Sequence, residues 1–118
     1  MHATRQYCLT LDLNCDEDLI REYEEFHRPG NVWSEVVDSI RESGIIDMQI
    51  YRSGTQLIMV MSVDESFSFE DKARQDSQNP KVIEWESLMT KFQVVHDDAD
   101  STQKWRVVAN VFKLQEHI

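Results

Sequence analysis

The sequence has few of the residues that cross-link or interrupt a chain. Its 118 residues include two cysteines, three glycines and two prolines. Two cysteines cannot build a disulfide framework, and Cys8 and Cys15 lie too far apart to bridge if residues 6–13 form one strand. The scarcity of glycine and proline excludes collagen-like and low-complexity chains. We therefore expect two free thiols in a single domain, residues 1–118, in the reducing cytoplasm.

Positive charge is also scarce. The sequence has 12 Lys and Arg residues and 22 Asp and Glu residues, which gives a formal net charge of −10. An acidic surface repels nucleic-acid phosphates and the anionic face of a membrane. No apolar run approaches the length of a membrane span, and residues 1–6 lack the apolar centre of a signal peptide. We expect no nucleic acid and no membrane as partners, and a neutral small molecule as the substrate that such a surface admits most easily.

Common catalytic motifs are missing as well. The sequence contains no Cys/His cluster with zinc spacing, no glycine-rich phosphate loop and no Gly-x-Ser-x-Gly elbow. It predicts no metal site. Any function must therefore come from titratable and aromatic side chains on faces that would otherwise be apolar.

Hydrophobic periodicity predicts the order of the elements. We expect strands at 5–13, 45–51, 56–63 and 105–114, helices at 16–27, 32–43 and 80–92, an ambiguous segment at 67–77 and an acidic loop at 96–102. This is the split β-α-β-β-α-β order of a ferredoxin-like α+β sandwich, an antiparallel sheet with helices on one face. Residues 57–61 are apolar on both sides, so the other face also needs cover. A second copy of the chain would provide it, as a homodimer.

Tyr23 and His27 are the first candidate functional pair. Their spacing of four places them on one face near the end of the first predicted helix. An imidazole there can exchange protons near neutral pH, and a phenol beside it can orient a polar ligand. A simpler interpretation, which the residues alone favour, is that His27 caps the helix C-terminus, where a cation is stabilised.

Trp85 and Glu86, on the last predicted helix, are the second candidate pair. Tryptophan often packs against the apolar faces of sugar rings, and a carboxylate can bind two adjacent hydroxyls. The alternative is that Trp85 belongs to the core and Glu86 is one of many solvated acids. In the strand at 45–51, polar Asp47, Gln49 and Tyr51 alternate with Met48 and its apolar neighbours. We interpret that polar side as a dimer interface.

Several segments follow one another in a characteristic order: Tyr23-x-x-x-His27 with Pro29, Val32–Glu35, Gly44–Tyr51, Leu57–Met61, Trp85-Glu86-x-Leu88-Met89 and Val111-Phe112-x-Leu114. In this order they resemble the L-rhamnose mutarotase family over nearly the whole chain. The resemblance implies a ferredoxin-like dimer of the α/β-barrel type. It also implies interconversion of the α and β anomers of a 6-deoxy-L-sugar, a monosaccharide substrate, without metal or organic cofactor.

The same resemblance assigns roles to individual residues. His27 takes the place of the family's proton-donating histidine, and Tyr23 that of a sugar-binding tyrosine on the same helix. Met48 stands where a second sugar-contacting tyrosine is usual, so that hydrogen bond is absent. Trp85 matches the first residue of a tryptophan pair, and Glu86 replaces the second. Both replacements alter hydroxyl recognition and point to L-fucose as an alternative to L-rhamnose.

Mutarotation requires one acid and one base with pKa values near neutrality. We expect His27 to protonate the ring oxygen while Tyr23 orients the sugar, with Glu86 binding hydroxyls or sharing the proton transfer. Two other functions stay open at this point. One is a non-catalytic ligand-binding or regulatory dimer, and the other is a cofactor-free monooxygenase, which rests on fold analogy alone.

Overall fold

A computed structural model describes residues 5–94 and 104–117 of the chain. In this part the strands are β1 (Arg5–Asp12), β2 (Ile45–Ser53), β3 (Gln56–Val63) and β4 (Arg106–Val108), and the α-helices are α1 (Glu17–Phe26), α2 (Ser34–Glu42), α3 (Phe69–Ser77) and α4 (Pro80–Met89). The strands form an antiparallel sheet in the order β2-β3-β1-β4. This order confirms the expected ferredoxin-like α+β class.

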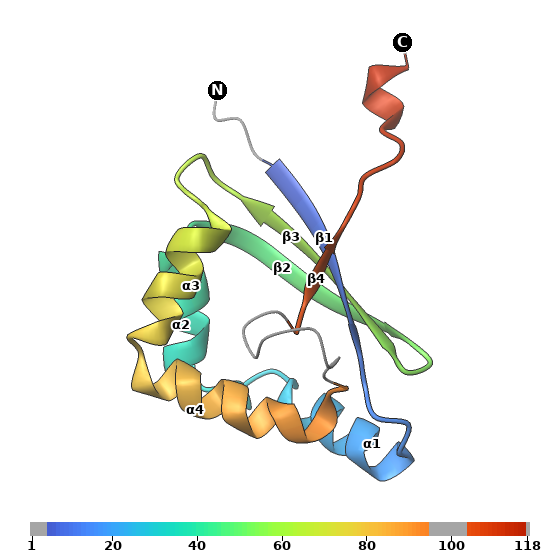
Figure 1. Cartoon of the computed structure of the whole chain (residues 1–118), viewed down its shortest axis with the longest axis vertical. Helices are drawn as coiled ribbons and strands as arrows, with labels where there is room; N and C mark the ends of the chain where they lie inside the picture. Colours follow the sequence, from blue (N-terminus) through green and yellow to red (C-terminus); the bar gives the residue numbers. More distant parts are fainter. Residues whose placement is uncertain (1–4, 95–103, 118) are drawn as a thin grey trace.

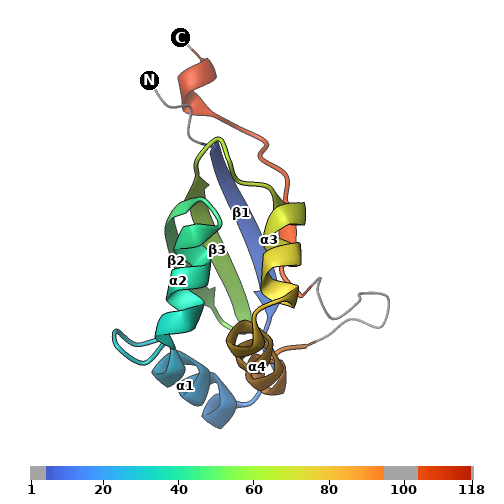
Figure 2. The same ribbon diagram turned by 90° about the vertical axis from the view of Figure 1, so that its left-hand side faces the viewer.

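The helices gather on one side of the sheet. Figure 2 shows α2 and α3 in front of the strands, and Figure 1 shows α4 running across the lower end, next to α1. Alternation along β3 separates its side chains by face. Met59 and Met61 point to the helices and are buried, whereas Ile58 and Val60 point to the helix-free face and are only half-buried. The expectation of helices on one face is confirmed.

The buried side chains form two clusters between sheet and helices. The first contains Tyr23, Trp85 and Phe92 with residues of β1 and β3, and it lies where α1 and α4 meet the sheet. The second contains Met59, Met61 and Phe67. Ile40 and Trp105 pack against both clusters. The first cluster therefore supplies a rigid base for any group at the C-terminal end of α1.

Local capping explains where the helices begin. The Asp16 carboxylate accepts hydrogen bonds from the backbone N–H groups of residues 18 and 19, which starts α1. Asn79 caps α4 in the same way, immediately before Pro80. The ambiguous segment 67–77 forms α3, and the Ser68 hydroxyl caps it by accepting from the backbone N–H of Asp71.

Two expected boundaries are wrong. The helix predicted at 80–92 ends at Met89 and continues as a 3₁₀ turn, Thr90–Phe92, which brings Phe92 into the core with 1% of its surface exposed. The strand predicted at 105–114 is confined to Arg106–Val108, because its pairing with β1 stops at Cys8. Beyond it the chain leaves the sheet (Figure 1) and ends in a second 3₁₀ turn, Leu114–Glu116. The predicted loop at 96–102 falls outside the described residues.

Gly44 joins α2 to β2 in a conformation that only glycine accepts easily. Its φ is +98°, and a Cβ there would lie 2.7 Å from Oδ1 of Asp64. The backbone N–H of Asp64 also donates to the Gly44 carbonyl.

In residues 5–94 and 104–117, no helix is long and apolar enough to cross a membrane.

Candidate active site at the C-terminal end of α1

The His27 imidazole is held by the backbone of α1. His27 is the C-cap residue of this helix, and its Nδ1 lies 2.8 Å from the carbonyl oxygen of Tyr23. Since a carbonyl only accepts, Nδ1 carries the donated proton, and the neutral ring keeps its lone pair on Nε2. No group in residues 5–94 or 104–117 hydrogen-bonds to Nε2. Among the described residues, the ring thus has one nitrogen anchored and the other without a protein partner.

Aromatic rings fix the plane of the imidazole. It stacks on the Tyr23 ring with centroids 4.1 Å apart and 28° between planes. Trp85 meets it edge-on at 5.6 Å. Tyr23 and Trp85 are 4% and 5% exposed, and Phe92 and Trp33 pack against them. The half-buried His27 therefore packs against a buried group of aromatic rings.

This environment makes His27 a proton-transfer group rather than a fixed cation. Burial lowers the pKa of His27, and the hydrogen bond to the Tyr23 carbonyl offsets only part of that effect. A cationic helix cap would raise the pKa instead. Capping of α1 therefore accounts for the position of Nδ1, but it does not account for the charge state of the His27 imidazole. Burial also raises the pKa of the Tyr23 hydroxyl, which stays protonated and able to donate.

Glu86 follows Trp85 on α4 but has a different environment. Trp85 belongs to the core, as the simpler interpretation held. Glu86 retains an exposed side chain, yet desolvation by the surrounding protein raises the pKa of its carboxyl, and the nearby Lys104 ammonium lowers it in part. The Glu86 charge in turn raises the pKa of Tyr23, so the carboxyl acts on the region around that hydroxyl. The structure thus brings Tyr23, His27 and Trp85 into contact, and Glu86 follows Trp85 on α4.

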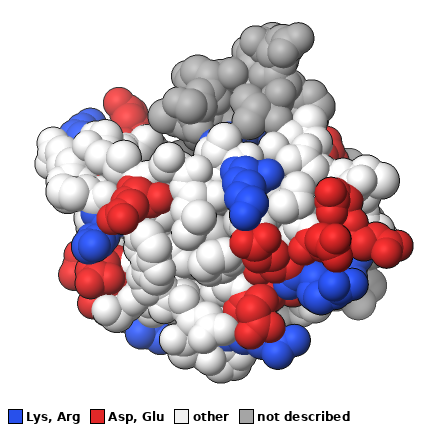
Figure 3. Space-filling model, turned by 90° about the horizontal axis from the view of Figure 1, so that it is seen from below, with Lys and Arg blue, Asp and Glu red and all other residues white. Residues whose placement is uncertain are grey.

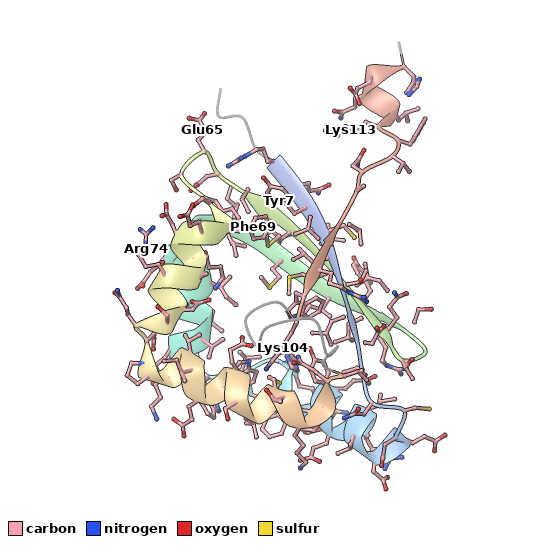
Figure 4. The ribbon with its side chains drawn as sticks, in the orientation of Figure 1. Tyr7, Glu65, Phe69, Arg74, Lys104 and Lys113 are labelled. Atoms are coloured by element: carbon pink, nitrogen blue, oxygen red, sulfur yellow. The ribbon has the colours of Figure 1, made fainter. Side chains whose placement is uncertain are left out.

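Lys104 is a neighbour of this group that the sequence did not indicate. Its ammonium donates to the backbone carbonyl of Glu86 at 3.0 Å and to the Thr90 hydroxyl. In Figure 4 it lies just above α4, between that helix and the lower end of the sheet. The sequence held one indirect signal for the position of Lys104. The next residue is Trp105, an aromatic residue that packs against the core and so holds this segment close to the helices.

Met48 is not brought into this group. It pairs with Met61 across β2 and β3 and packs against the second core cluster. Asp47, Gln49 and Tyr51 of the same strand lie on the helix-free face, where the Tyr51 hydroxyl donates to Oε1 of Gln49.

Within the described ranges, no three His, Cys, Asp or Glu side chains are grouped so that they could hold an ion. Both cysteines are free, as expected: Cys8 is half-buried and Cys15 exposed. Seen from below, basic side chains lie beside acidic ones (Figure 3). The ion pairs of the described residues include Lys91–Glu22 and Lys81–Glu84.

Comparison with known proteins shows the family to which the chain belongs. A sequence model of L-rhamnose mutarotases matches residues 6–114, almost the whole chain. The chain belongs to the L-rhamnose mutarotase family. The L-fucose mutarotase of Xanthomonas campestris pv. campestris is 40% identical over 116 residues, covering 98% of this chain and 93% of that protein. A protein of Dictyostelium discoideum is 36% identical over 84% of this chain and 78% of its own length.

A solved structure agrees with the fold of this family member. The crystal structure of the L-rhamnose mutarotase FA22100 from Formosa agariphila superimposes with a TM-score of 0.68, covering 92% of this chain and 97% of the other. The two sequences are 17% identical, so the match supports the architecture alone. Family membership favours an anomer-interconverting isomerase over the regulatory dimer and the monooxygenase.

Proposed function

We propose that this protein is a mutarotase that interconverts the α and β anomers of a 6-deoxy-L-sugar. The observation that carries the proposal is the His27 imidazole, which has Nδ1 bound to the Tyr23 carbonyl, Nε2 available and a pKa lowered by burial. Such a ring can accept a proton and release it again without leaving its position. Trp85 and Tyr23 form the aromatic base beside which the sugar would lie.

Mutarotation moves one proton out of the sugar and one into it. During ring opening, the anomeric hydroxyl loses its proton while the bond between the anomeric carbon and the ring oxygen breaks. The ring oxygen gains a proton, and the new aldehyde rotates before the ring closes on its other face. His27, after taking up a proton from solvent on Nε2, donates that proton to the ring oxygen, and ionised Glu86 accepts the anomeric proton. On closure both protons return, so the enzyme is unchanged.

The environment suits a proton exchange that runs in both directions. Free histidine and glutamate have pKa values of 6.5 and 4.5, and here the pKa of His27 is lowered while that of Glu86 is raised. The two acidities therefore approach each other, which makes transfer in either direction less costly. The protonated Tyr23 hydroxyl orients the sugar by donating a hydrogen bond. Because mutarotation also occurs without an enzyme, a modest lowering of the barrier is sufficient.

L-Fucose is the proposed preferred substrate. Two observations support it: the 40% identical relative is an L-fucose mutarotase, and Glu86 adds a carboxylate that can accept from sugar hydroxyls. Met48 offers no hydroxyl of its own and packs against the second core cluster, so the proposed sugar site is built without it. Saturation-transfer NMR between the two anomeric protons, with and without the protein, tests the proposal. Faster exchange for L-fucose than for L-rhamnose supports it, and unchanged exchange for both sugars overturns it.

We further propose a cytoplasmic homodimer formed through the helix-free face of the sheet. Its two free thiols fit a reducing compartment. Tyr51 and Val108 are exposed on this face and flank the half-buried Ile58 and Val60. The segment after β4 adds further exposed apolar side chains, Val111, Phe112 and Leu114. A second copy of the chain would cover this apolar surface.

A further inference from the structure

Gln93 carries a polar atom that is buried without a hydrogen bond. The residue is 6% exposed, and its Oε1 has no hydrogen-bond partner among the described residues. Within residues 5–94 and 104–117 it is the one buried side-chain nitrogen or oxygen in this state. Buried polar groups nearly always have a partner, because an unsatisfied group loses its interactions with water and gains none in return. The amide oxygen of Gln93 is therefore an acceptor that the described residues do not use.

The backbone of Gln93 is fixed at the end of β1. Gln93 forms an antiparallel bridge with Leu13, immediately beyond that strand. On one side of the bridge the N–H of Val94 donates to the carbonyl of Asp12 at 2.8 Å, and on the other side the neighbouring residues are joined by a similar bond of 2.9 Å. The side chain therefore starts from a defined point on the sheet.

The bridge also decides on which side of the sheet the amide lies. Directly opposed residues of an antiparallel pair place their side chains on the same face. Leu13 is 3% exposed and belongs to the first core cluster, together with Tyr23 and Trp85. The Gln93 side chain thus points to the side that the helices cover, where the candidate active site lies.

The preceding residue connects Gln93 to that site. The Phe92 ring meets the Tyr23 ring edge-on at 5.9 Å, and Tyr23 stacks on the His27 imidazole at 4.1 Å. Neither the Tyr23 hydroxyl nor Nε2 of His27 has a hydrogen-bond partner among the described residues. Three polar groups at the first core cluster, from α1 and from the segment after α4, are thus left without a protein partner.

We propose that Gln93 is a sugar-binding residue whose Oε1 accepts a hydrogen bond from one hydroxyl of the 6-deoxy-L-sugar. This inference rests on the proposed mutarotase function and adds to it a residue that determines specificity. A hydroxyl is a neutral donor, so it satisfies the amide oxygen without burying a charge. A sugar with the opposite configuration at that carbon leaves the oxygen unpaired, and a site built to bind a hydroxyl rejects such a ligand strongly.

The first test replaces Gln93 by Met, which keeps the length of the side chain and removes the amide. We expect KM for L-fucose to rise about tenfold with a smaller change in kcat, because the hydrogen bond holds the sugar in the ground state and in the transition state alike. The melting temperature should stay the same or rise, since the variant no longer buries an unpaired oxygen.

Gln75→Met is the matched control. The Gln75 amide already donates to the backbone carbonyl of Ser39 at 3.0 Å, so its loss should lower the melting temperature and leave KM at the wild-type value. A glutamine with a purely structural role at position 93 would behave in the same way. A lowered melting temperature with wild-type KM in Gln93→Met would therefore overturn the inference.

Deoxy analogues identify the hydroxyl that Gln93 binds. Analogues of L-fucose that each lack one non-anomeric hydroxyl are compared in wild type and Gln93→Met. The variant should lose its disadvantage for one analogue, the one without the bound hydroxyl, and keep it for the others. An equal disadvantage for every analogue would show that the amide contacts no single hydroxyl and would contradict the proposal.

A third measurement uses the wild-type protein and does not depend on turnover. The side-chain NH₂ signals of Gln93 can be assigned by NMR through their bonds to the Gln93 backbone, and L-fucose is then added. A shift of these signals, with those of Gln75 unmoved, supports the inference. Unmoved Gln93 signals while the protein accelerates anomer exchange refute the inference alone. Absence of both exchange and any sugar-induced shift refutes the proposed function as well, so the two failures are distinguishable.

Discussion

The imidazole of His27 stacks on the ring of Tyr23, with the ring centroids 4.1 Å apart, while its Nδ1 forms a hydrogen bond with the carbonyl oxygen of the same tyrosine. One residue therefore supports the histidine through both its side chain and its backbone. The hydrogen bond assigns the tautomer, and the stacking excludes water from one side of the ring. Both effects leave Nε2 as the reactive nitrogen.

Replacing His27 by Gln should abolish most of the anomer exchange, because an amide cannot accept and release protons near neutral pH. We expect a loss on the order of 10²-fold or more in kcat/KM, measured by saturation-transfer NMR. His117→Gln, in the exposed C-terminal segment, is the control and should keep full activity. Wild-type exchange rates in His27→Gln would remove His27 from the mechanism.

Tyr23→Phe tests the hydroxyl separately from the ring. The stacking on His27 remains, so the fold should persist, while the hydrogen bond to the sugar is lost. We expect an increase in KM of about tenfold, as for one neutral hydrogen bond. Tyr23→Ala removes the buried ring as well and should destabilise the protein by about 3–5 kcal/mol in urea unfolding. An unchanged KM in Tyr23→Phe would show that the hydroxyl does not contact the substrate.

The lowered pKa of His27 predicts how stability depends on pH. Below about pH 6.5 an unfolded histidine binds a proton that the folded one still refuses, so the unfolded state is favoured as the pH falls. His27 should therefore make the protein less stable as pH decreases from 6.5 through its folded pKa. The raised pKa of Glu86 acts in the opposite sense between pH 4.5 and its folded value.

The comparison of wild type with His27→Gln isolates the histidine contribution. Urea unfolding at several pH values from 7.5 to 5 should show a steeper loss of stability for wild type than for the variant. Parallel curves would mean that the histidine titrates alike in both states.

Gly44→Ala should be poorly tolerated. A Cβ would meet Oδ1 of Asp64 at 2.7 Å, and φ is +98°, so both crowding and backbone strain oppose it. We expect a destabilisation of about 2 kcal/mol or more by thermal unfolding. Gly30→Ala is the matched control, because φ is +88° there but no atom lies within 4 Å of the added Cβ. Equal losses in both variants would assign the cost to the backbone alone.

The proposed dimer predicts that a charge on the helix-free face separates the subunits. Ile58→Lys should shift the mass measured by light scattering from that of a dimer toward that of a monomer, because the new charge would be buried. Ile83→Lys is the control, on an exposed position of α4 that is 51% accessible. A wild-type protein of monomer mass would overturn the proposal directly.

Local features of the chain were sufficient to predict most of the elements and the candidate pair Tyr23 and His27. Alternation in β1, the apolar run in β3 and the helical spacing of Tyr23 and His27 are short-range patterns, and each is satisfied in the structure. The last strand was overestimated because its apolar residues have the correct period but find only three partners on β1. The segment 67–77 was ambiguous because its helix is polar and is started by the Ser68 cap rather than by an apolar stripe.

The sequence by itself determined the order of strands and helices, the placement of Tyr23 and His27 on one helix face and the neighbouring positions of Trp85 and Glu86. These follow from backbone geometry over a few residues. Tertiary structure alone decided that Lys104 reaches Glu86, that Met48 packs in the other core cluster, and that burial shifts the pKa values of His27 and Glu86 toward each other. Desolvation and charge interactions depend on distances through space between elements, which the periodicity of a single segment does not encode.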